Sequence, residues 1–310
     1  MNNNEQDLRV DIGGGLQLNN PLMTASGTFG YGREFESFAD LDNLGAIVVK
    51  GISLNPRPGN PPPRIVETAC GMLNAIGLEN VGLEAFIKDK MPYLKGRKCP
   101  LVVNILGDSI EEYRHLAAVL DKEDGISAIE LNISCPNVKK GGVAFGSQPD
   151  LARELTSTVR QATSLPLIVK LSPNVSDIGA MARAAEAGGA NAVSLINTLI
   201  GMAIDIRLKK PVLANITGGL SGPAIKPVAL RMVWQAADAV RIPVIGIGGI
   251  STWQDAIEFI LAGASAIQVG TANFFNPAAV DEIQAGIKRY MRKNNINQLQ
   301  TLIGAAKGGK

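Results

Sequence analysis

I-E-L-N-I-S-C-P-N, residues 129–137, starts as a buried strand and ends as a loop that carries a thiol. Residues 128–133 form the short, mostly apolar run that is typical of a strand buried on both faces. Pro136 stops this strand, so Asn132 and Cys135 fall at and just beyond its C-terminal end. In a barrel of parallel strands this end carries the chemistry, which makes Cys135 a candidate reactive group. The alternative is that Cys135 is a small buried hydrophobe, as free cysteines usually are.

Seven further short apolar segments occur along the chain, and amphipathic runs separate most of them. The eight predicted strands are Pro21–Ser26, Ala46–Lys50, Leu101–Ile105, Ala128–Ile133, Leu167–Leu171, Ala192–Ile196, Val244–Ile247 and Ala266–Val269. The predicted helices include Val81–Leu94, Ser109–Asp121, Asp150–Thr163, Asp177–Ala187, Ala224–Ala239, Trp253–Ala262 and Pro277–Met291. This alternation implies a parallel α/β sheet, and eight repeats favour a closed (β/α)8 TIM barrel over an open doubly wound sheet. We expect residues 1–310 to form this single domain.

Two regions depart from the alternation of strands and helices. Residues 51–80 are rich in proline and glycine, and residues 197–223 contain the glycine-rich run G-G-L-S-G-P. Long loops inside a compact domain are usually functional. Both regions follow the C-terminal ends of strands, so we expect both to lie over the same mouth of the barrel. The polar tail from about Asn294 is expected to fray.

The composition predicts a globular protein without a strongly charged surface. Of the 310 residues 46% are hydrophobic and 19% are charged, and 30 basic and 28 acidic residues give a net charge of +2. This balance does not favour binding to nucleic acid or to an anionic membrane. No apolar run approaches the roughly 18 residues of a membrane helix, and the N-terminus has no signal-peptide pattern. We therefore expect a cytoplasmic protein.

The cysteine and histidine content narrows the possible chemistry. Cys70, Cys99 and Cys135 form no C-x-x-C pair, so we expect neither a metal site nor an iron–sulfur cluster on this chain alone. The single histidine, His115, lies in a charged helical run and is predicted to be a surface residue. Triads and multi-histidine metal sites are therefore improbable. A general base would be Cys, Lys, Asp, Glu or a hydroxyl group.

Polar residues recur where the predicted strands end. They are Ser26, Lys50 and Gly51, Asn104, Asn132, Lys170, and Asn197 with Thr198. Because these ends meet at one rim of a barrel, they indicate a site for a planar ligand that forms hydrogen bonds. The amides can donate to and accept from a ring with carbonyl and N–H groups. For any single asparagine, the alternative is a role in capping its loop.

Two of these residues are lysines within buried-strand patterns, which are rare unless they are paired. No acidic residue adjoins Lys50 or Lys170 in the sequence. An anionic ligand is the natural partner, such as a carboxylate, a phosphate or a reduced flavin ring. The alternative is a salt bridge to an Asp or Glu that is distant in sequence.

Glycines after the last two predicted strands indicate a phosphate site. Gly248 and Gly249 follow the seventh strand, and Gly270 and Thr271 follow the eighth strand. The loops at these places form the common phosphate site of this fold, because glycine lets backbone N–H groups approach the phosphate oxygens. Gly222 and its neighbours in the preceding loop could add further donors. The pattern predicts a phosphate but does not identify the molecule that carries it.

The motifs around these residues identify a known family. They are V-V-K-G at 48–51, N-A-I-G-L at 74–78, L-N-I-S-C-P-N at 131–137, V-K-L-S-P-N at 169–174 and A-N-I-T-G-G-L-S-G-P-A-I-K-P at 214–227. In these motifs the chain resembles the class 1 dihydroorotate dehydrogenases, specifically the class 1B catalytic subunit, over nearly its whole length. That family is an FMN-bound barrel that oxidises dihydroorotate to orotate in pyrimidine biosynthesis. We find no departure at any motif position.

The resemblance implies a role for each matching residue, with one FMN per chain. FMN would contact Ser26, Lys50, Gly51, Asn104, Asn132, Lys170 and Ile196, and its ribityl phosphate would contact Gly222, Gly248, Gly249, Gly270 and Thr271. The pyrimidine would contact Lys50, Asn74, Ala75, Ile76, Gly77, Leu78, Asn132, Asn197 and Thr198. Cys135 would be the catalytic base that removes the C5 proton while a hydride passes from C6 to FMN.

The resemblance also implies a partner, because the reduced flavin must be reoxidised. Class 1B enzymes use a second subunit with FAD and a [2Fe–2S] cluster, which passes electrons to NAD⁺ and joins a homodimer of the catalytic chain in a heterotetramer. The alternatives are a class 1A enzyme that uses fumarate, another FMN-barrel dihydropyrimidine oxidoreductase, or a non-redox phosphate-binding lyase or isomerase. A barrel that binds its ligand without turnover is less compatible with Lys50, Cys135 and the paired glycines.

Overall fold

Eight parallel strands form a barrel in the computed structural model, which describes residues 6–134 and 145–308. Their order in the sheet is β3-β16-β15-β10-β9-β8-β7-β4. The barrel closes where Gly45 N donates to Leu22 O (2.7 Å) and Thr24 N donates to Ala46 O (3.3 Å). The strands are β3 (Leu22–Thr24), β4 (Ile47–Val48), β7 (Leu101–Ile105), β8 (Ala128–Asn132), β9 (Leu167–Lys170), β10 (Ala192–Leu195), β15 (Val244–Ile247) and β16 (Ala266–Val269). The predicted (β/α)8 barrel is therefore confirmed.

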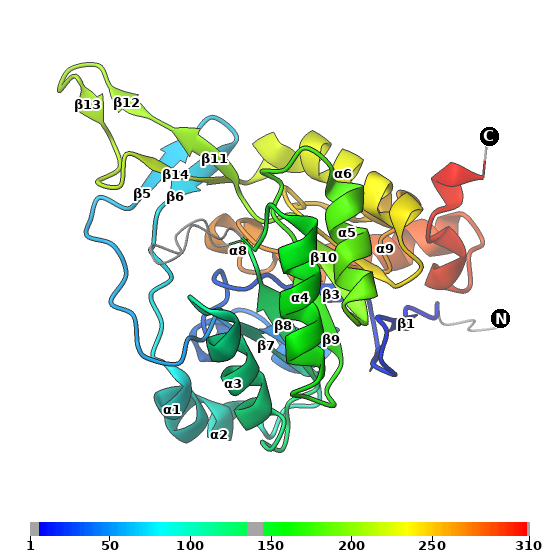
Figure 1. Ribbon diagram of the computed structural model, residues 1–310. Coiled ribbons are helices and arrows are strands. Elements are labelled where there is room, and N and C mark those ends of the chain that lie inside the picture. The colour runs from blue at the N-terminus through cyan, green and yellow to red at the C-terminus, as the bar shows by residue number, and fades with distance from the viewer. Residues whose placement is uncertain (1–5, 135–144, 309–310) are drawn as a thin grey trace.

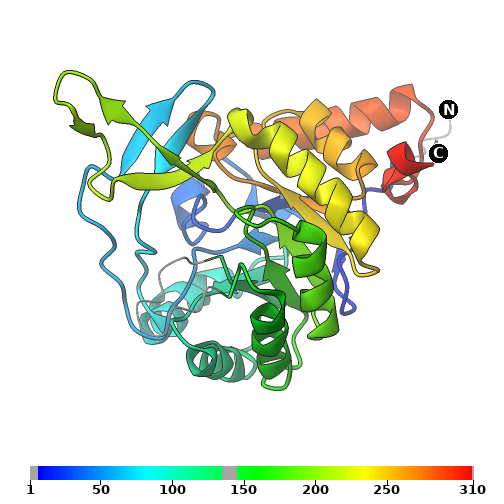
Figure 2. The ribbon, with the colours of Figure 1, turned by 45° about the horizontal axis from the view of Figure 1, so that its top comes forward.

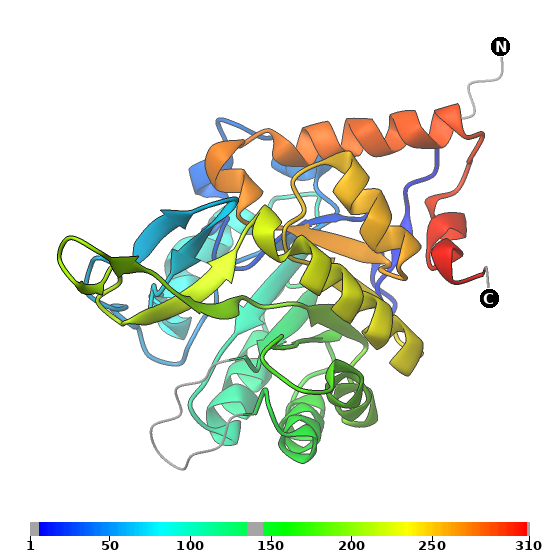
Figure 3. The same cartoon turned by 90° about the horizontal axis from the view of Figure 1, so that it is seen from above.

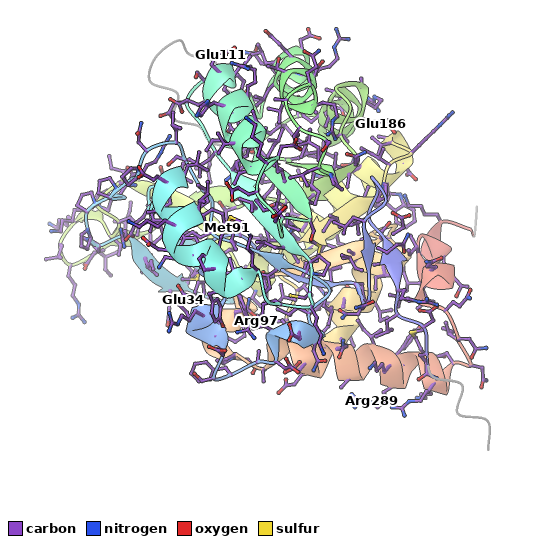
Figure 4. The ribbon with its side chains drawn as sticks, turned by 90° about the horizontal axis from the view of Figure 1, so that it is seen from below. Glu34, Met91, Arg97, Glu111, Glu186 and Arg289 are labelled. Atoms are coloured by element: carbon purple, nitrogen blue, oxygen red, sulfur yellow. The ribbon has the colours of Figure 1, made fainter. Side chains whose placement is uncertain are left out.

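Helices surround the strands (Figure 3). They are α1 (Leu83–Ala85), α2 (Met91–Leu94), α3 (Ile110–Leu120), α4 (Pro149–Arg160), α5 (Ile178–Ala187), α6 (Lys226–Ala239), α7 (Trp253–Leu261), α8 (Ala272–Phe275) and α9 (Ala279–Lys293). Glu111 on α3, Glu186 on α5 and Arg289 on α9 mark the outer side of this ring (Figure 4). In the part of the chain that the structure describes, no helix combines the length and apolar character needed to cross a bilayer.

The interior of the barrel contains polar side chains as well as apolar ones. Asn104 from β7, Glu130 from β8, Ser194 from β10 and Gln268 from β16 are joined by hydrogen bonds. Strands β8 and β16 are not neighbours in the sheet, so these side chains must meet inside the barrel. Since side chains alternate along a strand, the buried residues Ile129 and Leu131 face outwards to the helices.

An ion pair fixes the start of α7 against α6. Thr252 and Asp255 form a reciprocal capping box at the N-terminus of α7. The other carboxylate oxygen of Asp255 accepts a hydrogen bond from Lys226 Nζ (2.7 Å). Burial acts to raise the pKa of Asp255, but the bonds from Lys226, Ser251 and Thr252 outweigh it and lower the pKa. The charged carboxylate is therefore favoured by folding.

We expect Asp255→Asn to lower the free energy of unfolding by about 1–3 kcal/mol at pH 7, because it removes the charge that these donors bind. A lowered pKa contributes stability above the unfolded value of about 3.9, and this contribution is lost as the pH falls through the folded value. The difference in the free energy of unfolding between the variant and the wild type, measured by urea titration, should therefore shrink below about pH 4. Asp238→Asn is the control, since Asp238 pairs with Lys307 at an exposed site and should lose about 0–1 kcal/mol. Equal losses in both variants would contradict the prediction.

The two regions that were predicted as long loops contain strands, and these strands pair with each other. The sheet order is β11-β14-β6-β5, and all of its pairs are antiparallel. Its strands are β5 (Ile65–Thr68), β6 (Gly71–Asn74), β11 (Leu199–Met202) and β14 (Thr217–Ser221). Figure 2 shows this sheet beside one end of the barrel. Regular structure was missed here because β6, β11 and β14 contain glycine and β5 has only four residues, so none of them shows the apolar alternation that predicts a strand.

Two small hairpins lie outside the barrel and the four-stranded sheet. β12 (Ile204–Asp205) and β13 (Lys210–Pro211) pair in a hairpin that projects from the extra sheet (Figure 1), and β1 (Val10–Asp11) pairs with β2 (Gln17–Leu18). Around the projecting hairpin, Ile204, Ile206 and Leu208 are exposed.

The tail was expected to fray from about Asn294, and the structure differs in this respect. Leu299 and Leu302 are buried. The backbone also pairs with the N-terminal region, since Asp7 N donates to Asn297 O and Leu299 N donates to Asp7 O. The two leucines lie three residues apart and so share one side of a helical turn, which gives an otherwise polar segment an apolar face.

Candidate functional site

The ends of β8, β9 and β10 bring several predicted residues together. Asn132 and Lys170 are opposite each other in the β8–β9 ladder. Asn197 follows β10, and its Nδ2 donates to Asn132 Oδ1 (3.4 Å). The backbone carbonyl of Asn132 accepts a hydrogen bond from Tyr113 on α3 (2.6 Å). These contacts hold the Asn132 amide at the C-terminal mouth of the barrel, where sequence analysis placed it.

The two predicted lysines lie in the same region without a carboxylate partner. Lys170 is only 6% exposed, and Lys50 is half-buried directly after β4. Within residues 6–134 and 145–308, no carboxylate forms an ion pair with either ammonium group. A buried cation is costly unless it is paired. The arrangement therefore fits an anionic ligand better than the alternative of a distant salt bridge.

Three hydrogen bonds and one close approach of the backbone connect the extra sheet with Asn132. Asn74 Nδ2 on β6 donates to Gly219 O on β14 (3.4 Å), and a Cβ added at Gly219 would lie 2.1 Å from Thr198 Oγ1. The backbone N–H of Thr198 donates to Asn197 Oδ1 (2.8 Å), and Asn197 in turn bonds Asn132. The structure thus joins four residues predicted to contact substrate, although they come from three separate parts of the sequence.

The predicted substrate residues Ala75–Leu78 form a loop, and hydrogen bonds from Asn60 and Asn80 hold this loop in place. Asn60 Nδ2 donates to Ala75 O (2.9 Å), and Asn60 N donates to Ile76 O (2.9 Å). Gly77 has a φ of +77°, and a Cβ there would lie 2.6 Å from Asn60 N. Leu78 O accepts from Asn80 Nδ2 (2.9 Å). The described contacts of this loop are therefore with the 57–64 segment and Asn80.

The predicted phosphate glycines are close to one another where β15 meets α6. A Cβ added at Gly249 would lie 2.9 Å from Gly222 O and 2.8 Å from the backbone N of Lys226. A Cβ at Gly248 would lie 3.3 Å from Ile196, which follows β10. All three glycines have positive φ values, which strain residues that have a Cβ.

The residues after β16 and β3 form a second part of the same rim. A Cβ added at Gly270 would lie 3.3 Å from Ala25 Cβ, next to the half-buried Ser26. Thr271 follows at the start of α8 and is also half-buried. Since β15 and β16 are neighbours, the Gly248–Gly249 pair and the Gly270–Thr271 pair lie on one side of the barrel mouth.

Asn104 and Gly51 are both buried and lie close to each other. Asn104 is fully buried, and its Nδ2 donates to Glu130 Oε2 (2.6 Å). Its Oδ1 has no hydrogen-bond partner in the described part of the chain. A Cβ added at Gly51 would lie 2.8 Å from this oxygen. Gly51 therefore allows the backbone after β4 to approach the Asn104 amide.

Glu130, Ser194 and Gln268 form the polar layer below this rim and were not predicted as site residues. A signal for Glu130 is present in residues 129–137, where a charged residue stands inside a buried strand. Charged residues in buried strands are rare unless paired, which holds for Glu130 as it does for Lys50 and Lys170. Cys135, the predicted base, lies outside the described residues.

Comparisons with known proteins agree with this geometry. The family model "Dihydroorotate dehydrogenase" matches residues 8–291. A Geotalea daltonii protein named "Dihydroorotate dehydrogenase B (NAD(+)), catalytic subunit" is 59% identical over 97% of this chain and 98% of its own length. Relatives of the same name from Pelobacter propionicus and Thermoanaerobacter pseudethanolicus are 59% and 56% identical. They cover 96% and 97% of this chain, and 98% and 99% of their own lengths.

Proposed function

The chain belongs to the dihydroorotate dehydrogenase family, and on this premise we propose that it is the FMN-dependent catalytic subunit of a type B enzyme. It oxidises dihydroorotate to orotate in pyrimidine biosynthesis and passes the electrons to a separate subunit. The observation that carries the proposal is the pair of lysines without carboxylate partners at the barrel mouth. They lie beside a line of amides that is suited to a pyrimidine.

The described residues fit FMN on grounds of their own chemistry. Lys170 supplies a buried positive charge for the electron-rich end of the ring, and Asn104 Oδ1 is an acceptor with no hydrogen-bond partner in residues 6–134 and 145–308. Gly222, Gly248 and Gly249 have backbones that no Cβ shields, as a bound phosphate requires. Ser26, Lys50, Gly51, Asn132, Ile196, Gly270 and Thr271 complete the set that we propose for the cofactor. When bound, FMN supplies the hydride acceptor.

The substrate ring is held by the line of amides in this proposal. Asn74, Asn132, Asn197 and Thr198 offer donors and acceptors to its carbonyl and N–H groups, and the loop from Ala75 to Leu78 covers it. Lys50 pairs with negative charge on the substrate or the cofactor. Cys135 takes the proton from C5, for which its thiol must first ionise.

The reduced flavin needs an electron acceptor, which we propose is a second subunit. This chain has no nucleotide-binding fingerprint that opens a strand–helix unit and no cysteine cluster. The names of the relatives include both NAD(+) and "catalytic subunit", which supports a second subunit. We propose that this subunit carries FAD and a [2Fe–2S] cluster and binds a homodimer of this chain in a heterotetramer.

A visible absorption spectrum and an anaerobic titration test the proposed function. The purified chain should show flavin absorption with about one FMN per chain, and dihydroorotate should bleach it in the absence of oxygen. Dihydrouracil, which lacks the carboxylate, is the control and should bleach the flavin far more slowly. A colourless protein that cannot be loaded with FMN would overturn the proposal and favour a non-redox phosphate-binding barrel.

Gly249→Val is expected to weaken FMN binding more than tenfold, because the new side chain must displace Lys226 or Gly222 where the phosphate is proposed to bind. A Cβ at Gly249 would lie 2.7 Å from Lys226 Cβ. The positive φ alone costs roughly 1–3 kcal/mol of stability. Flavin fluorescence during dilution measures the retention.

Gly15→Val separates the loss of FMN from the strain of the backbone. Gly15 has a φ of +81°, close to the +75° of Gly249, and a Cβ there would meet nothing within 4 Å. Gly15→Val should lose stability and still bind FMN as the wild type does. Unchanged FMN affinity in Gly249→Val would show that this glycine does not serve the phosphate.

A further inference from the structure

Glu130 is a fully buried carboxylate in the centre of the barrel. It accepts hydrogen bonds from Asn104 Nδ2 (2.6 Å), Ser194 Oγ (2.8 Å) and Gln268 Nε2 (2.7 Å). These donors come from three different strands. All three partners act as donors, which is the pattern that an ionised carboxylate needs, since it can only accept. No cation among the described residues is bonded to it, and such a buried charge is rare in a core and calls for a functional explanation.

The carboxylate fixes the orientation of two amides. Asn104 and Gln268 each use the NH₂ group to bind Glu130. The oxygens Asn104 Oδ1 and Gln268 Oε1 are left without a hydrogen-bond partner among the described residues. A side-chain amide can rotate so that its NH₂ group and its oxygen exchange places. Glu130 accepts hydrogen bonds from both NH₂ groups, and this holds both amide oxygens on the side away from the carboxylate. Glu130 thereby sets which way the Asn104 amide faces beside Gly51.

The carboxylate also lies close to the cationic part of the site. Lys170 is opposite Asn132 on one side and opposite Ser194 on the other, and Ser194 Oγ donates directly to Glu130. Asn132 and Glu130 are two residues apart on β8, so both point into the barrel. Glu130 is therefore a negative charge one layer below the Lys170 ammonium, and no described side chain forms an ion pair with either group.

We propose that Glu130 is a positioning residue for the flavin site, which orients the Asn104 amide and balances the charge of Lys170. The inference rests on the proposed function, namely that FMN binds at this mouth. Its consequence concerns the ease of flavin reduction. A buried negative charge in this layer would oppose the gain of electron density by a flavin bound at the barrel mouth, so Glu130 would keep its reduction potential lower than Lys170 alone would set it.

Glu130→Gln tests the inference, because it keeps the shape of the side chain and removes the charge. A unit charge at roughly 10 Å with an effective dielectric constant of about 20 changes an equilibrium about tenfold. We expect the variant to favour the reduced flavin about tenfold more than the wild type. This corresponds to a midpoint potential about 30 mV more positive for a two-electron couple. A redox titration against a dye of known potential measures it without any turnover.

Two further variants separate charge from structure. The new carboxamide of Glu130→Gln brings N–H donors to a place where three donors converge, so one amide must rotate. In Glu130→Gln combined with Gln268→Glu, the carboxylate moves across the same layer and the hydrogen bond between the two positions is restored. The potential should then return more than half-way to the wild-type value. Glu111→Gln removes an exposed charge on the outer side of α3 and should leave the potential unchanged.

Glu130→Met is a second charge-free variant, to be used if Glu130→Gln does not fold, and it should shift the potential in the same positive direction. A wild-type potential in either charge-free variant overturns the inference, even if that variant is less stable, because a purely structural role predicts lost stability alone. If the proposed function itself were wrong, the wild-type chain would bind no flavin, and this result differs from a failure of the Glu130 inference alone. A yellow wild type together with an unshifted variant removes only the role of Glu130.

Discussion

Cys135→Ser is expected to lose dihydroorotate oxidation by roughly 10²–10⁴-fold near neutral pH and to keep its FMN, because general base catalysis contributes a factor of this size. A thiol has a pKa of about 8.5, whereas a hydroxyl group is a far weaker acid and is rarely ionised at pH 7. Part of the activity should return at high pH as more of the hydroxyl ionises. Stopped-flow bleaching of the flavin by dihydroorotate, as a function of pH, isolates this step.

The other two cysteines provide matched controls. Cys70 is exposed, and burial raises the pKa of Cys99 to about 11, so Cys99 remains a thiol at neutral pH. In Cys70→Ser and Cys99→Ser, dihydroorotate should bleach the flavin at the wild-type rate. Cys99→Ser should nevertheless be less stable than the wild type, because it places a hydroxyl group in the core. Rapid bleaching in Cys135→Ser at pH 7 would show that another group removes the C5 proton.

The purified chain alone should reduce artificial electron acceptors with dihydroorotate and should not reduce NAD⁺ at a measurable rate. The reason is that the proposed FAD and [2Fe–2S] subunit, and not this chain, carries the site where NAD⁺ is reduced. Addition of the FAD and [2Fe–2S] subunit should restore NAD⁺ reduction. Steady-state absorbance at the NADH band measures NAD⁺ reduction by the chain alone and by the chain together with that subunit.

Fumarate is the control acceptor for this assay. Brisk fumarate reduction by the lone chain would place it with the class 1A enzymes, whereas brisk NAD⁺ reduction without a partner would remove the second subunit from the proposal. Dichloroindophenol reduction in the same preparation shows that the chain is active, so that a negative result with NAD⁺ has meaning.

The barrel could be predicted because its signals are local. Leu101–Ile105, Val244–Ile247 and Ala266–Val269 were predicted to the residue, since each is a short apolar run with clear boundaries. The rim residues followed from the same pattern, because the ends of parallel strands must meet. Asn132, Lys170 and Asn197 are accordingly close together in the structure.

Features that depend on pairing between distant segments could not be predicted. Nothing in the sequence around Asn74 or Gly219 shows that the two loops share a sheet, because the choice of partner strand is a property of the whole fold. The partners of Glu130 could not be predicted for a similar reason, although its charge inside a buried strand was visible in the sequence. Its three donors come from strands far apart in sequence, and only closure of the barrel brings them to one carboxylate.

The extra sheet affects the order in which this protein can assemble. Asn74 and Gly219 are hydrogen-bonded across 145 residues of sequence, and contacts of such separation form slowly because a long loop must first be closed. A chain still under synthesis that ends before β14 has all the residues of its first six barrel strands, whereas the two loops proposed to bind substrate cannot yet pair. The proposed substrate site is therefore completed late in synthesis, and only the closure of the barrel between β16 and β3 joins segments that are still further apart in sequence.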